Sequence, residues 1–133
     1  MKILIVDDES LARQRLRRLL AKERPEAALL EAENGTRALE LAFSERPQIV
    51  LLDIRMPEID GVEVAARLAE RERSPAVIFC TAYDEYALQA LEHQAIGYLL
   101  KPVRQRDLSK ALNNAVSLNS AQLDALEQLG RSA

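Results

Sequence analysis

The chain has 133 residues, of which 48% are hydrophobic and 29% charged, and its formal net charge at pH 7 is −3. This length and composition suit one globular domain with a hydrophobic core. The acidic balance argues against nucleic-acid binding by this segment, which would need a basic face. Cys80, the single cysteine, excludes an intrachain disulfide, and no apolar run is long enough for a signal peptide or a membrane span. We therefore expect a reducing, cytoplasmic location.

Strands and helices alternate from the first residues onward. The apolar run at residues 3–6 predicts a strand buried on both faces, as in a parallel sheet. Apolar residues spaced i, i+4, i+7, i+8 then predict a helix over residues 10–22. A second strand is predicted at residues 28–32. Asn34 is expected to cap the next helix, which must end before Pro47.

The alternation continues through the second half of the chain. Residues 49–52, 77–80 and 98–100 predict three more strands. Asp60 is expected to cap a helix that starts at Gly61, a short helix is expected at residues 85–93, and the last helix runs from 104 to about 117. Five strand–helix units with short loops predict an α/β fold that has helices on both faces of a parallel sheet.

Residues 118–133 differ in pattern from the rest of the chain. Three leucines there have helical spacing, but serine and glycine residues interrupt them. We therefore predict a folded domain at residues 1–117 and a linker or C-terminal tail at 118–133. The abrupt end of the tail suggests a linker that leads into a longer protein.

Five polar side chains follow the predicted strands directly. The carboxyl ends of parallel strands share one edge of the sheet, where ligands bind in open α/β folds. Clustered carboxylates are costly unless a cation or a proton neutralises them, and their hard oxygens suit Mg²⁺. A lysine and a hydroxyl suit phosphate oxygens, and an aspartate can accept a phosphoryl group. The residues are Asp7 and Asp8, then Asp53 as candidate nucleophile, Thr81 and Lys101.

Each of these residues also has an ordinary structural explanation. A lone aspartate at a strand end is usually a turn or cap residue, and Thr81 alone is most often a cap. The Lys101-Pro102 pair by itself merely ends a strand. Their joint occurrence, each after a strand in a simple β/α alternation, favours one shared site.

Together these residues resemble the motifs of two-component response-regulator receiver domains, over residues 1–117. The resemblance implies a flavodoxin-like, doubly wound sheet of five parallel strands in the order 2-1-3-4-5 with five helices. It also implies that the domain is not a classical enzyme, since it performs only self-catalysed phosphotransfer and autodephosphorylation. The matching motifs are Asp7-Asp8-Glu9, Asp53 with Met56-Pro57 and Asp60-Gly61, Thr81-Ala82 and Lys101-Pro102.

The resemblance assigns roles at the site. By it, Asp53 is the phosphorylation site and receives its phosphoryl group from a sensor histidine kinase. Asp8 and Asp53 bind Mg²⁺ directly, together with the backbone carbonyl of Arg55, and Asp7 acts largely through water. Thr81 and Lys101 bind the phosphoryl group.

The resemblance also implies a switch. Thr81 would move toward the phosphoryl group and Tyr98 would turn into the vacated space, with the peptide bond before Pro102 in the cis form. The surface over the fourth helix, fifth strand and fifth helix would then change, which favours a homodimer through this face. Simple packing of the fourth helix on the sheet is the alternative. The face carries Ala87, Ala90, Leu91, Ala95 and Val103.

Two longer runs, residues 81–87 and 95–102, are similar to receivers of LytTR-type transcription factors, including the alginate regulators. Those proteins carry a C-terminal DNA-binding domain. The resemblance therefore implies transcription regulation, with DNA contacted through a domain outside this segment and with no membrane partner.

Three other functions remain open. A flavodoxin-type cofactor binder would need a Ser/Thr/Gly-rich loop after the first strand, where this chain has Asp7-Asp8-Glu9. A phosphohydrolase with an aspartyl nucleophile would need an acid two residues later, where Arg55 stands. A degenerate receiver used for protein contacts would not need the complete set of five site residues. His93, the single histidine, is best explained by the dipole at the end of a helix.

Overall fold

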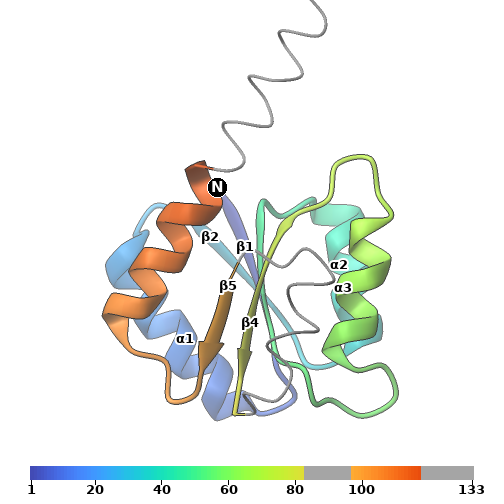
Figure 1. Cartoon of the computed structure of the whole chain (residues 1–133), viewed down its shortest axis with the longest axis horizontal. Helices are drawn as coiled ribbons and strands as arrows, with labels where there is room; N and C mark the ends of the chain where they lie inside the picture. Colours follow the sequence, from blue (N-terminus) through green and yellow to red (C-terminus); the bar gives the residue numbers. More distant parts are fainter. Residues whose placement is uncertain (83–96, 118–133) are drawn as a thin grey trace, which may run out of the picture.

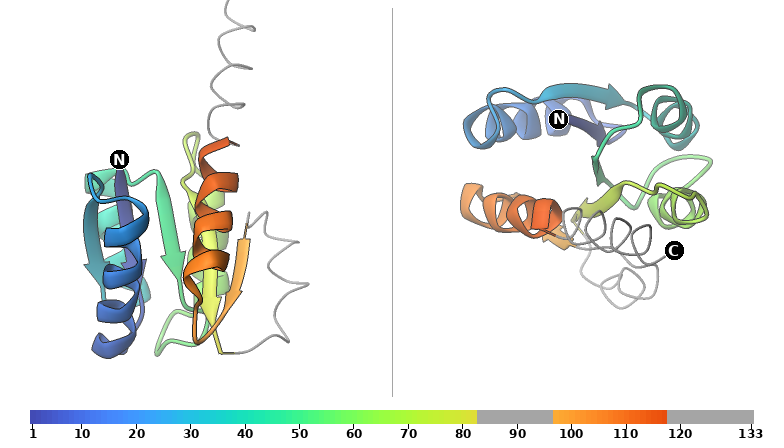
Figure 2. Two further views of the ribbon diagram at one scale, coloured as in Figure 1. Left: turned by 90° about the vertical axis from the view of Figure 1, so that its left-hand side faces the viewer. Right: turned by 90° about the horizontal axis from the view of Figure 1, so that it is seen from above.

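The computed structural model describes residues 1–82 and 97–117. These residues form a five-stranded parallel sheet in the order β2-β1-β3-β4-β5, with helices on both faces (Figures 1 and 2). The doubly wound fold and its strand order are therefore confirmed. The strands are β1 (Lys2–Val6), β2 (Ala28–Ala32), β3 (Ile49–Leu52), β4 (Ala76–Thr81) and β5 (Gly97–Leu100).

Four helices lie within the described residues. They are α1 (Ser10–Glu23), α2 (Gly35–Glu45), α3 (Gly61–Ala69) and a helix at residues 105–117, called helix 105–117 below. The helix predicted at residues 85–93 falls outside the described part of the chain. Within the ranges 1–82 and 97–117, no helix combines the length and hydrophobicity needed to cross a membrane.

The central strands are apolar along their whole length because both of their faces are covered. Successive side chains of a strand point to opposite faces, so each strand contributes to two separate cores. Ile3, Ile5 and Ile78 pack with α1 and helix 105–117, whereas Leu4 and Phe79 pack with α2 and α3. Viewed from above, the sheet lies between these two pairs of helices (Figure 2).

Two helices begin at the residues that the sequence predicts. The side chain of Asn34 accepts a hydrogen bond from the amide of Arg37 at 2.8 Å, and that of Asp60 accepts one from the amide of Glu63 at 2.9 Å. Each bond satisfies an amide that has no partner inside its helix, which is how these residue types fix a helix start.

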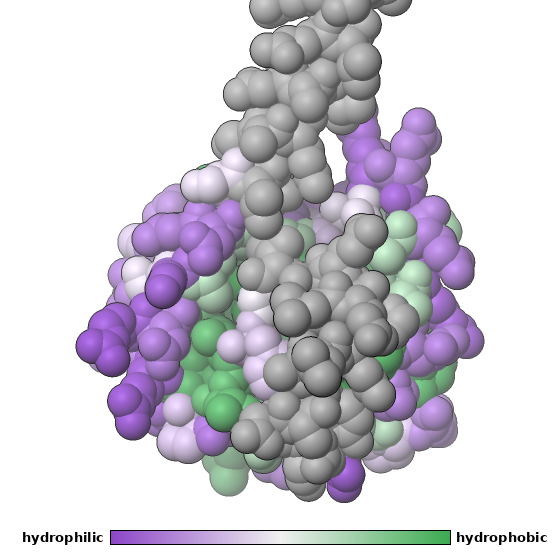
Figure 3. Space-filling view, in the orientation of Figure 1, coloured by the Kyte–Doolittle hydropathy of each residue, from purple (hydrophilic) through white to green (hydrophobic). Residues whose placement is uncertain are grey.

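Val103 corrects one expectation about the surface. Its predicted place on a dimerisation face is wrong, because Val103 is only 3% exposed and packs in the core between α1 and helix 105–117. The other apolar residues assigned to that face lie outside the described residues. Most of the left side of Figure 3, the side of α1 and helix 105–117, is hydrophilic, with a smaller hydrophobic patch low down. On α1, the side chains of Arg15, Arg18 and Lys22 are exposed.

Cys80 lies in the same core and is 1% exposed. Burial raises the pKa of its thiol to about 12, so the thiolate is scarcely populated at neutral pH. Cys80 is therefore a small buried hydrophobic residue of the core.

Gly61 lets the start of α3 approach the end of β3 closely. A Cβ atom there would collide with the carbonyl oxygen of Asp53 and come within 2.8 Å of the Cα atom of Ile54. The amide of Gly61 also donates to the carbonyl of Ile54 at 2.7 Å. The sequence indicated only a helix start at this glycine, but the structure shows that main-chain packing requires it.

We predict that Gly61→Ala lowers the free energy of unfolding by about 1–3 kcal/mol, the usual cost of overpacking. Gly35→Ala is the matched comparison. There the nearest atom is a Val64 methyl group at 2.9 Å, which can shift, and the nearest main-chain atom is the carbonyl oxygen of Ile59 at 3.0 Å. The main chain is thus farther away than at Gly61, so the loss should be smaller. Urea denaturation of both variants measures the difference, and equal losses would contradict the main-chain explanation.

Candidate functional site

The site lies where β1, β3 and β4 end. β1 and β3 pair in parallel register up to Val6 and Leu52, so the residues that follow, Asp7 and Asp53, lie beside each other. The amide of Asp53 continues the ladder by donating to the carbonyl of Val6 at 3.0 Å. Sheet register, rather than loop structure, therefore brings the two aspartates together, as the sequence predicts.

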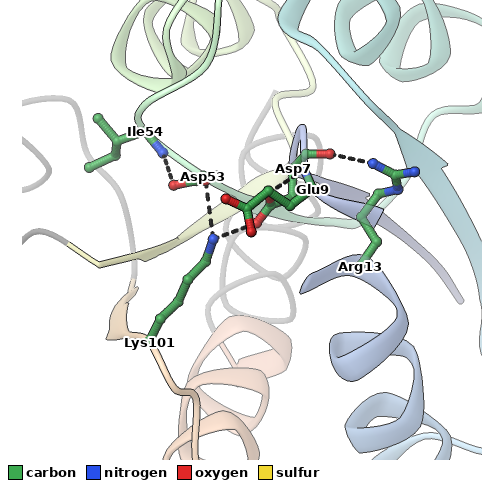
Figure 4. A network of polar contacts seen from close by, with 6 residues as sticks. All are labelled: Asp7, Glu9, Arg13, Asp53, Ile54 and Lys101. Carbon is green, nitrogen blue, oxygen red and sulfur yellow. Dashed lines mark hydrogen bonds and ion pairs between the residues drawn. The ribbon is translucent and has the colours of Figure 1, made fainter. Parts of the chain in front are cut away.

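Asp7 forms hydrogen bonds through both carboxylate oxygens, its amide and its carbonyl. Its side chain is 1% exposed; one carboxylate oxygen accepts from the Lys101 ammonium at 2.6 Å and the other from the amide of Glu9 at 2.9 Å. Its amide donates to the carbonyl of Ala32 at 3.1 Å, and its carbonyl accepts from Arg13 at 2.7 Å (Figure 4). A buried charge of this kind is tolerated because it is both paired and hydrogen-bonded.

Lys101 bridges the two aspartates from the segment after β5. Its ammonium lies 2.6 Å from Asp7 and 3.2 Å from Asp53, and its side chain is 25% exposed (Figure 4). Burial alone would lower the pKa of Lys101, but the hydrogen bond to Asp7 and the charges of both aspartates outweigh it, so the pKa is raised. Lys101 is therefore a fixed cation at neutral pH.

Asp53 is 7% exposed and accepts from the amide of Ile54 at 2.8 Å and from Lys101. Burial raises the pKa of its carboxyl, and the negative charge of Asp7 acts in the same direction, against the lowering effect of Lys101. The ionised form of Asp53 is thus held in a site that disfavours it, a common property of reactive groups.

Asp7, Asp8 and Asp53 form a group that could hold a metal ion. One carboxylate oxygen from each lies within 4.8 Å of the others, and Asp8 is the exposed member. When all three are ionised, three carboxylates and the one ammonium of Lys101 leave an excess of two negative charges. A divalent cation that prefers oxygen ligands matches both this charge and this donor set.

Thr81 ends β4 beside this cluster. The backbone amide of Lys101 donates to the carbonyl of Thr81 at 2.8 Å, which ties the two residues together. Thr81 is fully buried, and among the described residues its hydroxyl has no hydrogen-bond partner. Leaving a buried hydroxyl unsatisfied costs about 1–3 kcal/mol, so this hydroxyl is well suited to an incoming acceptor.

The two remaining predicted residues lie at the margin of the site. Arg55 is exposed in the loop after β3. Tyr98 is partly buried, and its ring lies 6.4 Å from that of Phe79 on the neighbouring strand. The peptide bond between Lys101 and Pro102 is cis, as expected.

Sequence reasoning did not identify Arg13, which contacts the main chain of Asp7, or Glu31, which binds Arg13. Arg13 donates to the carbonyl of Asp7 and forms an ion pair with Glu31 of β2 at 3.0 Å. One signal was available, since Glu31 is a charged residue within the predicted strand 28–32. A charge at such a position suggests a partner on the helix that covers that face.

Comparison with known proteins is consistent with this geometry. A family model described as "Response regulator receiver domain" matches residues 3–113. The chain is 58% identical over 127 residues to the "Positive alginate biosynthesis regulatory protein" of Pseudomonas aeruginosa, covering 95% of this chain and 51% of that protein. It is 41% identical over 122 residues to the "Transcriptional regulatory protein BtsR" of Salmonella typhi, covering 92% and 51%. The chain thus spans about half the length of the curated relatives it matches.

Solved structures agree with the fold. The response regulatory domain of protein mrkE from Klebsiella pneumoniae superposes with a TM-score of 0.81 at 29% identity, covering 89% of this chain and 97% of that one. A response regulator receiver domain protein from Clostridium thermocellum gives a TM-score of 0.83 at 30% identity, covering 91% and 98%.

The raised pKa of Asp53 predicts how stability depends on pH. The folded state holds this proton more tightly than the unfolded chain does, so the free energy of unfolding falls as pH rises from the ordinary aspartate pKa through the raised one. At pH 7 without metal, Asp53→Asn should therefore have a higher free energy of unfolding than the wild type. The gain should vanish in acid, where the wild-type carboxyl is protonated.

Urea denaturation between acid and neutral pH measures this difference, with Asp107→Asn, at an exposed position of helix 105–117, as the control. A gain for Asp53→Asn that does not change with pH would show that burial of its charge is not the cause.

Proposed function

Because this chain belongs to the response-regulator receiver domain family, we propose that Asp53 accepts a phosphoryl group from a sensor histidine kinase and that this modification switches an output. The observation that carries the proposal is the position of Asp53 in the polar network. Its nearly buried carboxylate is joined to Lys101 and lies within reach of two further carboxylates. An aspartate in this position is a nucleophile whose charge is held in place.

The proposed transfer follows from these contacts. A carboxylate oxygen of Asp53 attacks the phosphorus atom, and the bond from phosphorus to the donor breaks, with its electron pair leaving on the donor group. The new bond is an acyl phosphate. Lys101, whose raised pKa keeps it charged, offsets the negative charge on the phosphoryl oxygens, which is the usual contribution of a lysine in phosphoryl transfer.

Mg²⁺ is the proposed cofactor. Asp8 and Asp53 would hold it directly with the backbone carbonyl of Arg55, and Asp7 would act through water. The fit rests on three clustered carboxylates and an excess of two negative charges. When bound, the ion supplies positive charge that lets an anionic phosphoryl group enter an acidic site.

Thr81 and Tyr98 are the proposed switch. The unsatisfied hydroxyl of Thr81 gains a partner if it donates to a phosphoryl oxygen, and this gain favours its movement toward Asp53. Tyr98 packs against Phe79 on the strand that contains Thr81. A change at Thr81 would therefore have a short path to the surface beside β5, where rotation of Tyr98 would alter the shape.

The proposed output is transcription regulation in the cytoplasm. The curated relatives include a positive alginate biosynthesis regulatory protein and a transcriptional regulatory protein, each about twice as long as the matched segment. A DNA-binding domain outside this segment, brought into pairs by a homodimer of the phosphorylated domain, would account for such an output.

Phosphorylation of Asp53 is tested with acetyl phosphate and Mg²⁺, followed by intact-mass spectrometry. We expect one phosphoryl group on the wild type and on Asp107→Asn, and none on Asp53→Asn. Lys101→Ala should slow the modification about 100-fold, the usual effect of removing one charge-stabilising group. Modification of Asp53→Asn at the wild-type rate would refute the assignment.

Measurements of Mg²⁺ affinity distinguish the proposed roles of Asp8 and Asp7. Asp8→Ala should weaken Mg²⁺ binding by more than about tenfold, because loss of a residue that only hydrogen-bonds to a metal ligand already lowers metal affinity by about that factor. Asp7→Ala should weaken it less, because the Asp7 carboxylate is already held by Lys101 and the Glu9 amide. Calorimetric titration gives both affinities, and equal losses would contradict the assigned roles.

A further inference from the structure

Arg13 connects three elements around the acidic cluster. It extends from the first turn of α1 and donates through one terminal nitrogen to the carbonyl of Asp7 at 2.7 Å (Figure 4). Through its Nε it also binds Glu31 on β2 at 3.0 Å. Its side chain is 17% exposed, less than that of Glu31 at 34%. A largely buried guanidinium with two fixed partners has little conformational freedom.

The carbonyl of Asp7 lies where the sheet stops. Val6 is the last residue of β1 in register with β2 and β3, and the chain then turns into α1 at Ser10. A carbonyl at such a turn needs a donor from outside the ladder. Arg13 provides a charge-assisted hydrogen bond, which is stronger than a neutral one.

Asp8 depends on the same turn. It is the exposed member of the acidic group, and its carboxylate direction follows from the main chain between Asp7 and Glu9. That main chain is fixed on one side by the Glu9 amide, which donates to the Asp7 carboxylate, and on the other by Arg13. Without Arg13, only the hydrogen bond from the Glu9 amide to the Asp7 carboxylate would remain of these two.

We propose that Arg13 is a positioning residue: oriented by Glu31, it fixes the turn after β1 and thereby aims the Asp8 carboxylate at the cation site. The inference rests on the proposed function in so far as Asp8 is a metal ligand. Arg13 itself contacts neither the cation nor the phosphoryl group, so it acts through the main chain.

Arg17 provides a matched control. It lies one turn further along α1 and binds the same glutamate, Glu31, at 3.2 Å. No hydrogen bond joins Arg17 to Asp7 within the described residues. Removing Arg17 therefore weakens the tie between α1 and β2 but leaves the hydrogen bond at the turn intact.

The experiment compares Arg13→Ala, Arg13→Lys, Glu31→Gln and Arg17→Ala by two measurements. The first is Mg²⁺ affinity by calorimetry, which Arg13→Ala should lower about tenfold, at the lower end of outer-shell effects. Arg17→Ala should change it less than about twofold, because exposed ion pairs contribute little. The loss of Mg²⁺ affinity in Glu31→Gln should be intermediate between those of Arg13→Ala and Arg17→Ala. Arg13→Lys should recover only part of the affinity, since an ammonium cannot bind both partners as the fork does.

The second measurement is hydrogen exchange in the metal-free protein. The Glu9 amide, which donates to Asp7, should exchange severalfold faster in Arg13→Ala than in the wild type or Arg17→Ala. The amide of Asp53, bonded to Val6 within the sheet, serves as the internal reference and should not change.

The outcomes separate the inference from the proposed function. Unchanged affinity and unchanged Glu9 exchange in Arg13→Ala would overturn the inference and leave Arg13 as a tie between α1 and β2. Absence of Mg²⁺ binding in the wild type would instead count against the proposed function, and Glu9 exchange would still decide whether Arg13 fixes the turn. If Arg13→Ala does not fold, Arg13→Lys and Glu31→Gln give the same two readings.

Discussion

The ammonium of Lys101 lies between Asp7 and Asp53, two carboxylates that are almost removed from solvent. At separations near 3 Å and an effective dielectric constant of about 20, each attraction is on the order of 5 kcal/mol. Desolvation of three charges and repulsion between the aspartates offset most of it, so the net stabilisation is small. The main contribution of Lys101 is that its positive charge makes burial of the Asp7 and Asp53 carboxylates compatible with a folded domain.

Parallel pairing of the strands determines where the site residues lie. Because β1 and β3 stay in register to their last residues, the first residues beyond the sheet are neighbours without any loop to place them. β5 ends one residue before Lys101, and its pairing with β4 sets Thr81 opposite Leu100. Groups that are up to 94 residues apart along the chain are thus positioned by the backbone hydrogen bonds of the sheet.

Local chemistry explains why much of this could be predicted from the sequence. Apolar runs define the strands, and Asn34 and Asp60 define helix starts through bonds to residues three positions away. The features that were missed are non-local. The requirement for Gly61 comes from the Asp53 main chain, and the role of Arg13 depends on β2.

Val103 was placed wrongly for the same reason. An apolar residue after a strand can face solvent or core, and the choice depends on α1, where Arg15 donates to the Val103 carbonyl at 2.9 Å. The unsatisfied hydroxyl of Thr81 is likewise invisible in the sequence, because hydrogen-bond satisfaction depends on everything packed around a group.

The contact at Gly61 also determines where this domain tolerates change. The loop between β3 and α3 is closed at its base by the hydrogen bond from Gly61 to Ile54, and two of its side chains, Ile54 and Met56, are buried beneath it. Such a loop cannot be lengthened without displacing its buried side chains. The turn at residues 70–75 is mostly exposed. A peptide tag or a fused reporter domain would therefore be accommodated at that turn, whereas an insertion between β3 and α3 would displace Asp53 itself.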